Sequence, residues 1–160
     1  MTTIFVDGDA CPVVNEIIDL TAETGFFVTI LRSFSHFSHS HYPSHVNILY
    51  MDDGPDAVDY KIIQLVTTSD IVITQDYGLA SLLLKKARII MHHKGFIYNE
   101  NNIDILLQQR YNNAQIRKQG GRHKGPSPFS KEDRQYFCDV FQTLLNQLMI
   151  ICDQASIIKN

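Results

Sequence analysis

The sequence predicts one α/β domain in which a mainly parallel, five-stranded sheet is covered by helices on both faces. Five short runs rich in β-branched and aromatic residues alternate with segments whose apolar residues recur at helical spacing. This alternation is typical of parallel sheets with crossover connections. A chain of 160 residues, 44% of them hydrophobic, is long enough for one such core. The predicted strands are residues 3–6, 26–33, 46–51, 70–74 and 88–92.

Helices are predicted between these strands. After the first strand, Pro12 suits a first helical turn, Val13, Ile17 and Ile18 follow helical spacing, and Gly25 suits a helix end. The apolar spacing also predicts helices over residues 56–68 and 77–87.

The last third of the chain has a different pattern. A helix is predicted over residues 103–118, and the Gly- and Pro-rich segment that follows predicts a flexible basic loop at about 119–129. Ser130 and Asp133 form a capping-box pattern that begins a long amphipathic final helix. Its apolar stripe is Phe137, Val140, Phe141, Leu144, Leu148 and Ile151.

The cysteines and the apolar segments bear on where the protein works. Cys11, Cys138 and Cys152 are odd in number and lack zinc-ligand spacing, so we expect neither a disulfide framework nor a structural zinc site. Cys11 stands at a helix start, where we expect it to pack. No run approaches the roughly 18 apolar residues of a membrane span, and no basic-then-apolar leader begins the sequence. We therefore expect a cytoplasmic protein without a membrane partner.

The net charge of −3 conceals an uneven distribution. Between residues 117 and 131 there are five basic residues and no acid, whereas the rest of the chain carries nine basic and 17 acidic residues. A basic strip on an acidic body often contacts phosphates, although a solvated loop is the more common explanation. The candidate nucleic-acid-binding residues are Arg117, Lys118, Arg122 and Lys124.

Acidic residues follow two predicted strands, at the edge where ligands bind in open α/β sheets. Asp7 and Asp9 come directly after the first strand, and Asp76 follows the fourth. Asp76 reaches the same edge as Asp7 if the first and fourth strands are neighbours. Asp56 and Asp59 are three residues apart on one face of the helix after the third strand. We therefore expect five carboxylates to converge.

Converging carboxylates repel one another, and a hard divalent cation relieves this repulsion. Mg²⁺ binds a few carboxylates together with water and phosphate oxygens, and paired ions activate water for attack on a phosphodiester. The chemistry favours Mg²⁺ held by Asp7 and Asp9 at the end of the first strand. Helix capping is an equally good explanation of Asp9 and Asp56 taken individually.

Four segments in this order resemble a known family. "VDGDACPV", "DAVDYKIIQLV", "SDIVITQDYGLA" and "GGRHKGPSPFSKEDRQYF" are similar to the motifs of the bacterial YaiI/YqxD family, a branch of the PIN-like fold, over about residues 4–141. The resemblance implies a three-layer α/β/α PIN-like domain over residues 1–155. It also implies a metal-dependent ribonuclease in which Asp7, Asp59 and Asp76 are the catalytic acids and Asp9 and Asp56 are auxiliary. The same resemblance implies a Mg²⁺ or Mn²⁺ cofactor whose ligands are Asp7, Asp9, Asp59 and Asp76.

These residues support a metal-dependent phosphodiesterase acting on RNA or another phosphodiester. One alternative is a catalytically inactive nucleic-acid-binding module. Another is a haloacid-dehalogenase-like phosphatase with Asp7 as its nucleophile, although "ACP" follows the second acid of "DGD" where that class has Thr or Val. Fold alone does not choose among them.

Two groups of histidines stand apart from the acids. His36, His39, His41 and His45 lie in a Ser-rich loop, where solvent exposure or hydrogen bonding is favoured over zinc binding because the spacing fits no structural zinc site. His92 and His93 end the fifth strand, where at least one can face the same rim as the acids, although a surface position at the strand end is the favoured explanation.

Overall fold

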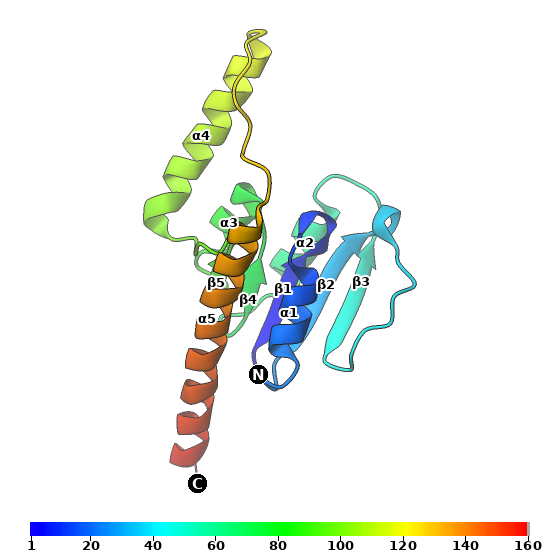
Figure 1. Ribbon diagram of the computed structural model, residues 1–160, viewed down its shortest axis with the longest axis vertical. Coiled ribbons are helices and arrows are strands. Elements are labelled where there is room, and N and C mark those ends of the chain that lie inside the picture. The colour runs from blue at the N-terminus through cyan, green and yellow to red at the C-terminus, as the bar shows by residue number, and fades with distance from the viewer. Residues whose placement is uncertain (160) are drawn as a thin grey trace.

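The computed structural model describes residues 1–159 as a three-layer α/β/α domain (Figure 1). The predicted fold class is confirmed: one sheet of five strands, all parallel, in the order β3-β2-β1-β4-β5. The strands are β1 (Thr3–Asp7), β2 (Phe27–Ser33), β3 (Val46–Met51), β4 (Ile71–Ile73) and β5 (Ile89–Met91). The helices are η1 (Gly8–Ala10), α1 (Val14–Thr21), η2 (Phe34–His36), α2 (Ala57–Leu65), α3 (Tyr77–Leu83), α4 (Glu100–Lys118) and α5 (Lys131–Ile158).

Both faces of the sheet are buried, as parallel sheets require. Because successive side chains of a strand point to opposite faces, Ile4 and Val6 of β1 pack under α1 and α5. Phe5, between them, packs against the layer that contains α2, α3 and the start of α4. The predicted stripe of α5 lies in the first of these cores as far as Leu148, whereas Ile151 is exposed.

The helix boundaries follow local chemistry. The predicted capping box of α5 is present, since Ser130 and Asp133 exchange side-chain and backbone hydrogen bonds. Helix α4 begins three residues earlier than predicted, because Asn99 and Asn102 form a second capping box. Helix α3 ends at Leu83, four residues before the predicted end.

Helix α4 projects away from the three layers and, with the chain that returns from it to α5, forms an arm (Figure 1). We call residues 104–125 the arm. Within the described residues, no helix combines the length and apolar character needed to cross a membrane.

Candidate active site

Asp7 ends the central strand of the sheet, at the point where the strand order reverses. The chain runs outward from β1 through β2 to β3, then returns to place β4 on the other side of β1. Connections leave the sheet in opposite directions from β1 and β4, which opens the crevice where α/β proteins bind ligands. The neighbouring position of β1 and β4, on which the convergence of Asp7 and Asp76 depends, is therefore present.

Gly8 and Asp9 fix the chain just after β1. A Cβ atom on Gly8 would lie 2.7 Å from Ile30 Cγ2 and 2.9 Å from the Leu31 carbonyl oxygen, so only glycine allows this approach to β2. Asp9 Oδ1 accepts a hydrogen bond from the Ser33 amide at 2.9 Å and lies 3.2 Å from His36 Nδ1. Asp9 thus joins the ends of β1 and β2.

Asp76 is the N-cap of α3. Its Oδ1 accepts a hydrogen bond from the Leu79 amide at 3.1 Å and lies 3.5 Å from Arg110 NH1 on α4. The Asp76 amide donates to Thr74 Oγ1 at 3.0 Å, and the Thr74 hydroxyl in turn donates to Asp7 Oδ2 at 3.0 Å. Thr74 therefore connects the two acids that follow β1 and β4.

Helix α2 supplies two further acids. Asp56 is its N-cap residue and has a left-handed backbone with φ of 65°, although its side chain makes no capping hydrogen bond. Left-handed backbone at a residue other than glycine costs about 1 kcal/mol or more and is concentrated at functional sites. Asp59 lies in the first turn and is half-buried.

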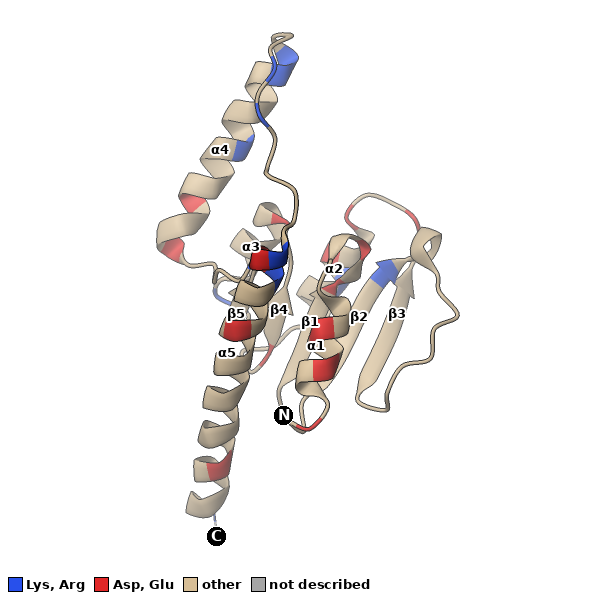
Figure 2. Ribbon diagram, in the orientation of Figure 1, with Lys and Arg blue, Asp and Glu red and all other residues tan. Residues whose placement is uncertain are grey.

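All five predicted acids line one cavity of about 210 Å³ at the carboxyl edge of the sheet. Figure 2 shows the acidic residues around α2 and the preceding loop at this edge. A groove of about 360 Å³ between α2, α3 and α4 adjoins this cavity, because Asp56, Asp59 and Asp76 line both. We call the cavity the acid cleft; its acids are Asp7, Asp9, Asp52, Asp56, Asp59 and Asp76.

The acids influence one another electrostatically. Burial, and then the charges of Asp76, Asp7 and Asp56, raise the pKa of Asp59 to about 6. Burial also raises the pKa of Asp7, with smaller contributions from Asp9 and Asp76, while the Thr74 hydrogen bond opposes the change. At neutral pH the carboxylates of the cleft therefore repel one another, and a bound cation would offset this repulsion.

The donor set of the cleft suits a hard divalent ion. Its carboxylate and hydroxyl oxygens are the ligands that Mg²⁺ and Mn²⁺ prefer. Within residues 1–159, no three His, Cys, Asp or Glu side chains are placed so that they could hold one metal ion together. Mg²⁺ sites commonly use one or two carboxylates and complete the shell with water and phosphate oxygens, so the open arrangement fits this type of site.

Comparisons with known proteins agree with the resemblance seen in the motifs. The sequence model described as "Uncharacterized BCR, YaiI/YqxD family" matches residues 5–147. The chain belongs to the YaiI/YqxD family. It is similar to a UPF0178 protein of Staphylococcus haemolyticus strain JCSC1435, with 68% identity over 148 residues, 92% of this chain and 100% of the relative. A UPF0178 protein of Staphylococcus aureus strain MRSA252 is 72% identical over 137 residues, 86% of this chain and 90% of the relative. No solved structure matches the chain significantly.

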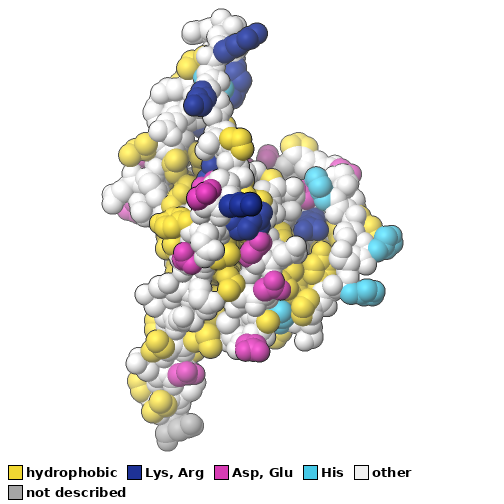
Figure 3. Space-filling model, in the orientation of Figure 1, with side chains coloured by type: hydrophobic (Ala, Val, Ile, Leu, Met, Phe, Trp, Pro, Cys, Tyr) yellow, Lys and Arg dark blue, Asp and Glu magenta, His cyan; other side chains and the backbone are white. Residues whose placement is uncertain are grey.

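The four basic residues predicted to bind nucleic acid lie apart from the acid cleft of this YaiI/YqxD protein. Arg117 and Lys118 end α4, and Arg122 and Lys124 follow in the irregular segment of the arm. All four are exposed. Figure 3 shows Lys and Arg side chains gathered at the outer end of this projection. Arg110, which lies near Asp76, and Arg117 belong to the same helix. About 10 Å of helix axis therefore separates the cleft from the start of the basic strip.

The expectation that His92 and His93 are surface residues is wrong. They are only 6% and 7% exposed. The chain after β5 turns back on itself, since the His92 amide donates to the Phe96 carbonyl and Met91 forms an antiparallel bridge with Ile97. Phe96 of this hairpin stacks on the His92 ring, and Phe129 of the segment before α5 meets the His93 ring edge-on. This is a tertiary effect that a strand-end position does not indicate.

Sequence reasoning missed three residues that shape the cleft. Asp52 and Ser33 line it from the ends of β3 and β2, and Thr74 links Asp7 to Asp76. Thr74 is recognisable in the sequence, since it begins the "TQD" segment after β4. Asp52 also follows a predicted strand, whereas nothing local distinguishes Ser33.

Proposed function

We propose that this protein is a divalent-metal-dependent phosphodiesterase that hydrolyses RNA. The observation that carries the proposal is the gathering of six aspartates in one cavity at the switch point of the sheet, where burial and then the charges of neighbouring acids raise the pKa of Asp59 to about 6. Carboxylates whose pKa is raised by burial and by neighbouring acids are typical of functional sites rather than of stabilising ion pairs.

Asp7, Asp59 and Asp76 are the proposed metal-holding acids, with Asp9 and Asp56 as auxiliary acids. Since no three acids within residues 1–159 surround a single point, one or two of them would bind the ion directly and the others through its water ligands. A bound Mg²⁺ or Mn²⁺ would neutralise the cleft and lower the pKa of a water molecule for attack on phosphorus. Thr74 orients the Asp7 carboxylate, and Asp76 is held by the start of α3 and by Arg110. In the reaction, the water oxygen bonds to phosphorus, one ester P–O bond breaks, and the leaving oxygen takes a proton.

The basic strip supports RNA as the substrate class. An acidic cleft by itself repels a polyanion, so binding requires cations that contact phosphates outside the cleft. Arg117 and Lys118 end the same helix whose Arg110 contacts Asp76, and Arg122 and Lys124 follow in the segment directly after it. We propose that these residues bind flanking phosphates and supply affinity without sequence preference.

The test is hydrolysis of a fluorescent single-stranded RNA by metal-free protein to which Mn²⁺ or Mg²⁺ is added back. Asp7→Asn and Asp76→Asn should each reduce the metal-dependent rate at least about 100-fold, the scale of losing a group that stabilises the transition state. Asn at position 76 can still cap α3. Asp104→Asn, the same change at an exposed position of α4, should keep the wild-type rate.

Each failure has a distinct meaning. RNA binding without hydrolysis under any metal condition would favour an inactive binding module. Metal-dependent hydrolysis of small phosphomonoesters through a phospho-Asp7 intermediate would favour the phosphatase alternative. Hydrolysis that survives both Asp→Asn changes would place the reaction elsewhere.

A further inference from the structure

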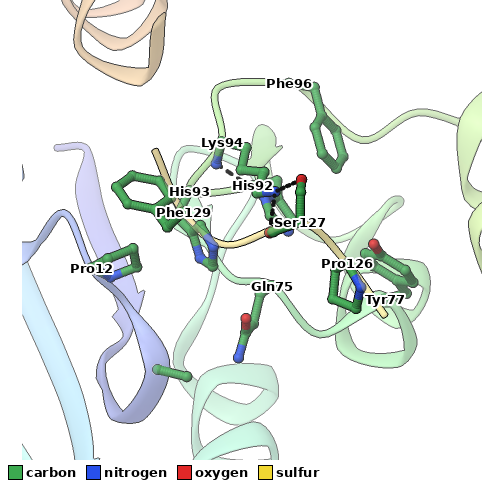
Figure 4. Close-up of a pocket in the computed structure, with 11 residues that line it drawn as sticks. Pro12, Gln75, Tyr77, His92, His93, Lys94, Phe96, Pro126, Ser127 and Phe129 are labelled. Atoms are coloured by element: carbon green, nitrogen blue, oxygen red, sulfur yellow. Dashed lines mark hydrogen bonds between the residues drawn. The ribbon is translucent and has the colours of Figure 1, made fainter. Parts of the chain in front are cut away.

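A second cavity of about 530 Å³ adjoins the acid cleft and plays no part in the hydrolysis proposed above. Figure 4 shows the residues that line it. We call it the aromatic pocket. Its rings come from the start of α3, from the hairpin after β5 and from the segment before α5. They are Tyr77, His92, His93, Phe96 and Phe129.

The rings form flat walls at stacking geometries. His92 and Phe96 are nearly parallel, with an interplanar angle of 16° and ring centroids 4.5 Å apart. Phe129 meets His93 edge-on, with centroids 5.5 Å apart. The ring centroids of Tyr77 and His92 are 6.3 Å apart, and the two rings are tilted by 43°. Such walls accept a planar ring by offset or edge-to-face contact.

The pocket offers neutral polar groups rather than charge. Burial lowers the pKa of both histidines, that of His92 to about 3, so both are neutral at physiological pH. The Lys94 amide donates to His92 Nδ1 at 2.9 Å, which leaves the ring proton on Nε2. Gln75 adds an exposed amide to the wall. Neutral donors and acceptors of this kind match the edge of a nucleobase.

The cation of the pocket, Lys94, is already engaged. Its Nζ donates to the Ser127 carbonyl at 3.2 Å and lies 3.8 Å from Asp133 Oδ2. This contact holds the segment with Ser127 and Phe129 over the pocket, as the dashed lines of Figure 4 show. Lys94 is therefore not free to pair with a small anion in this pocket. An uncharged planar group needs no such partner, because it would contact the aromatic side chains that line the pocket.

The pocket and the acid cleft meet through adjacent residues. Ala10 lines the pocket and Asp9 lines the cleft; likewise Gln75 lines the pocket and Asp76 the cleft. Consecutive residues of the segments after β1 and β4 thus line the two cavities, so the pocket and the cleft adjoin one another.

We propose that the aromatic pocket binds a nucleobase of single-stranded nucleic acid, adjacent to the phosphodiester in the acid cleft. The proposal rests on the proposed function, which identifies the polymer as RNA. It adds that the RNA must be unpaired at this position, because a base enters the pocket only when it is unstacked. Stacking of this kind is tolerant of sequence, since every base has a π face.

The experiment measures binding without metal, so that no hydrolysis occurs. Fluorescence anisotropy in EDTA compares an end-labelled RNA octamer of adenosines with a ribose-phosphate octamer of the same length that lacks bases. Wild-type protein should bind the base-bearing octamer about 5- to 100-fold more tightly, the range that one stacked base supplies. Phe96→Leu and Tyr77→Leu should each reduce this ratio at least threefold. Phe27→Leu, the same change at the amino edge of the sheet, should leave it unchanged.

The outcomes separate this proposal from the function on which it rests. An equal affinity of wild-type protein for the two octamers, or a ratio unchanged in both pocket variants, would overturn the aromatic pocket as a base site. A base-dependent ratio that the pocket variants abolish, in a protein that never hydrolyses RNA with Mn²⁺, would support the pocket and reject the nuclease. Thermal unfolding of each variant checks the fold, and Tyr77→Leu alone decides if Phe96→Leu does not fold.

Discussion

The Thr74 hydroxyl donates a hydrogen bond to Asp7 Oδ2 at 3.0 Å while its oxygen accepts one from the Asp76 amide at 3.0 Å. The Tyr98 hydroxyl in turn donates to the Thr74 carbonyl at 3.1 Å. A threonine that is only 2% exposed thus joins the ends of β1 and β4 and orients one carboxylate of the acid cleft.

Thr74→Val should destabilise the protein by about 1–3 kcal/mol, because it removes the hydrogen bond to Asp7 and also leaves the Asp76 amide without its acceptor. It should also weaken Mn²⁺ binding, since the pKa of Asp7 rises further without the hydroxyl. Urea unfolding and Mn²⁺ titration measure the two effects. Thr74→Ser keeps the hydroxyl and should restore both; equal Mn²⁺ affinity in Val and Ser variants would show that Thr74 does not orient the site.

Asp59→Asn should stabilise the metal-free protein at pH 7 by at most about 2 kcal/mol, because it removes a repelled charge that is partly screened by solvent. Thermal unfolding in EDTA should show the higher melting temperature. Added Mn²⁺ should stabilise wild-type protein more than the variant, through preferential binding to the folded state. Asp104→Asn is the matched control, and identical Mn²⁺-induced shifts in wild type and Asp59→Asn would exclude Asp59 as a ligand.

His92 makes the stability depend on pH in a defined direction. Its pKa is about 3 in the folded protein and about 6.5 in the unfolded chain, so the unfolded state binds more protons below pH 6.5. The free energy of unfolding should fall by about 2 kcal/mol between pH 7 and pH 5 on account of this residue. His92→Asn, which keeps an acceptor for the Lys94 amide, should show a shallower decline in urea unfolding; parallel curves for both proteins would contradict a buried neutral His92.

Arg122→Ala together with Lys124→Ala should weaken RNA binding for all sequences alike. For single-stranded RNA, the slope of log affinity against log salt should decrease by roughly 0.7 for each lost phosphate contact. Mn²⁺ binding at the acid cleft should not change. Lys85→Ala with Arg88→Ala removes the same charge from exposed positions near the amino end of β5 and is the control. An unchanged slope in the arm variant would mean that the basic strip is only solvated.

Limited trypsin digestion should cut first after Arg122 or Lys124, because the segment from Gln119 to Gly125 has few backbone hydrogen bonds and is largely exposed. Mass spectrometry of the first fragments identifies the site. Initial cleavage at Lys85 or Arg88 instead would show that the loop is better ordered than the body of the domain.

Local patterns in the sequence determined the elements and the chemistry that each one carries. Strands β1 to β5 were predicted within one residue at each end, because runs of β-branched residues buried on both faces are distinctive. The start of α5 was predicted at Ser130, since a capping box depends only on residues three apart. The position of Asp7, Asp9 and Asp76 after strands likewise followed from the chain itself.

Which of these residues meet was decided by the tertiary structure alone. The sequence left open whether β1 and β4 are neighbours, and the return of the chain past β1 places Asp7 and Asp76 in one cavity. Asp52 enters the cleft for the same reason. His92 and His93 were expected at the surface and are buried, because a hairpin and a segment some 35 residues later in the chain cover them. The spacing of apolar residues indicates which face of a helix or strand packs against the core. It does not indicate which distant segments of the chain will pack over the end of that element, because no local pattern encodes those contacts.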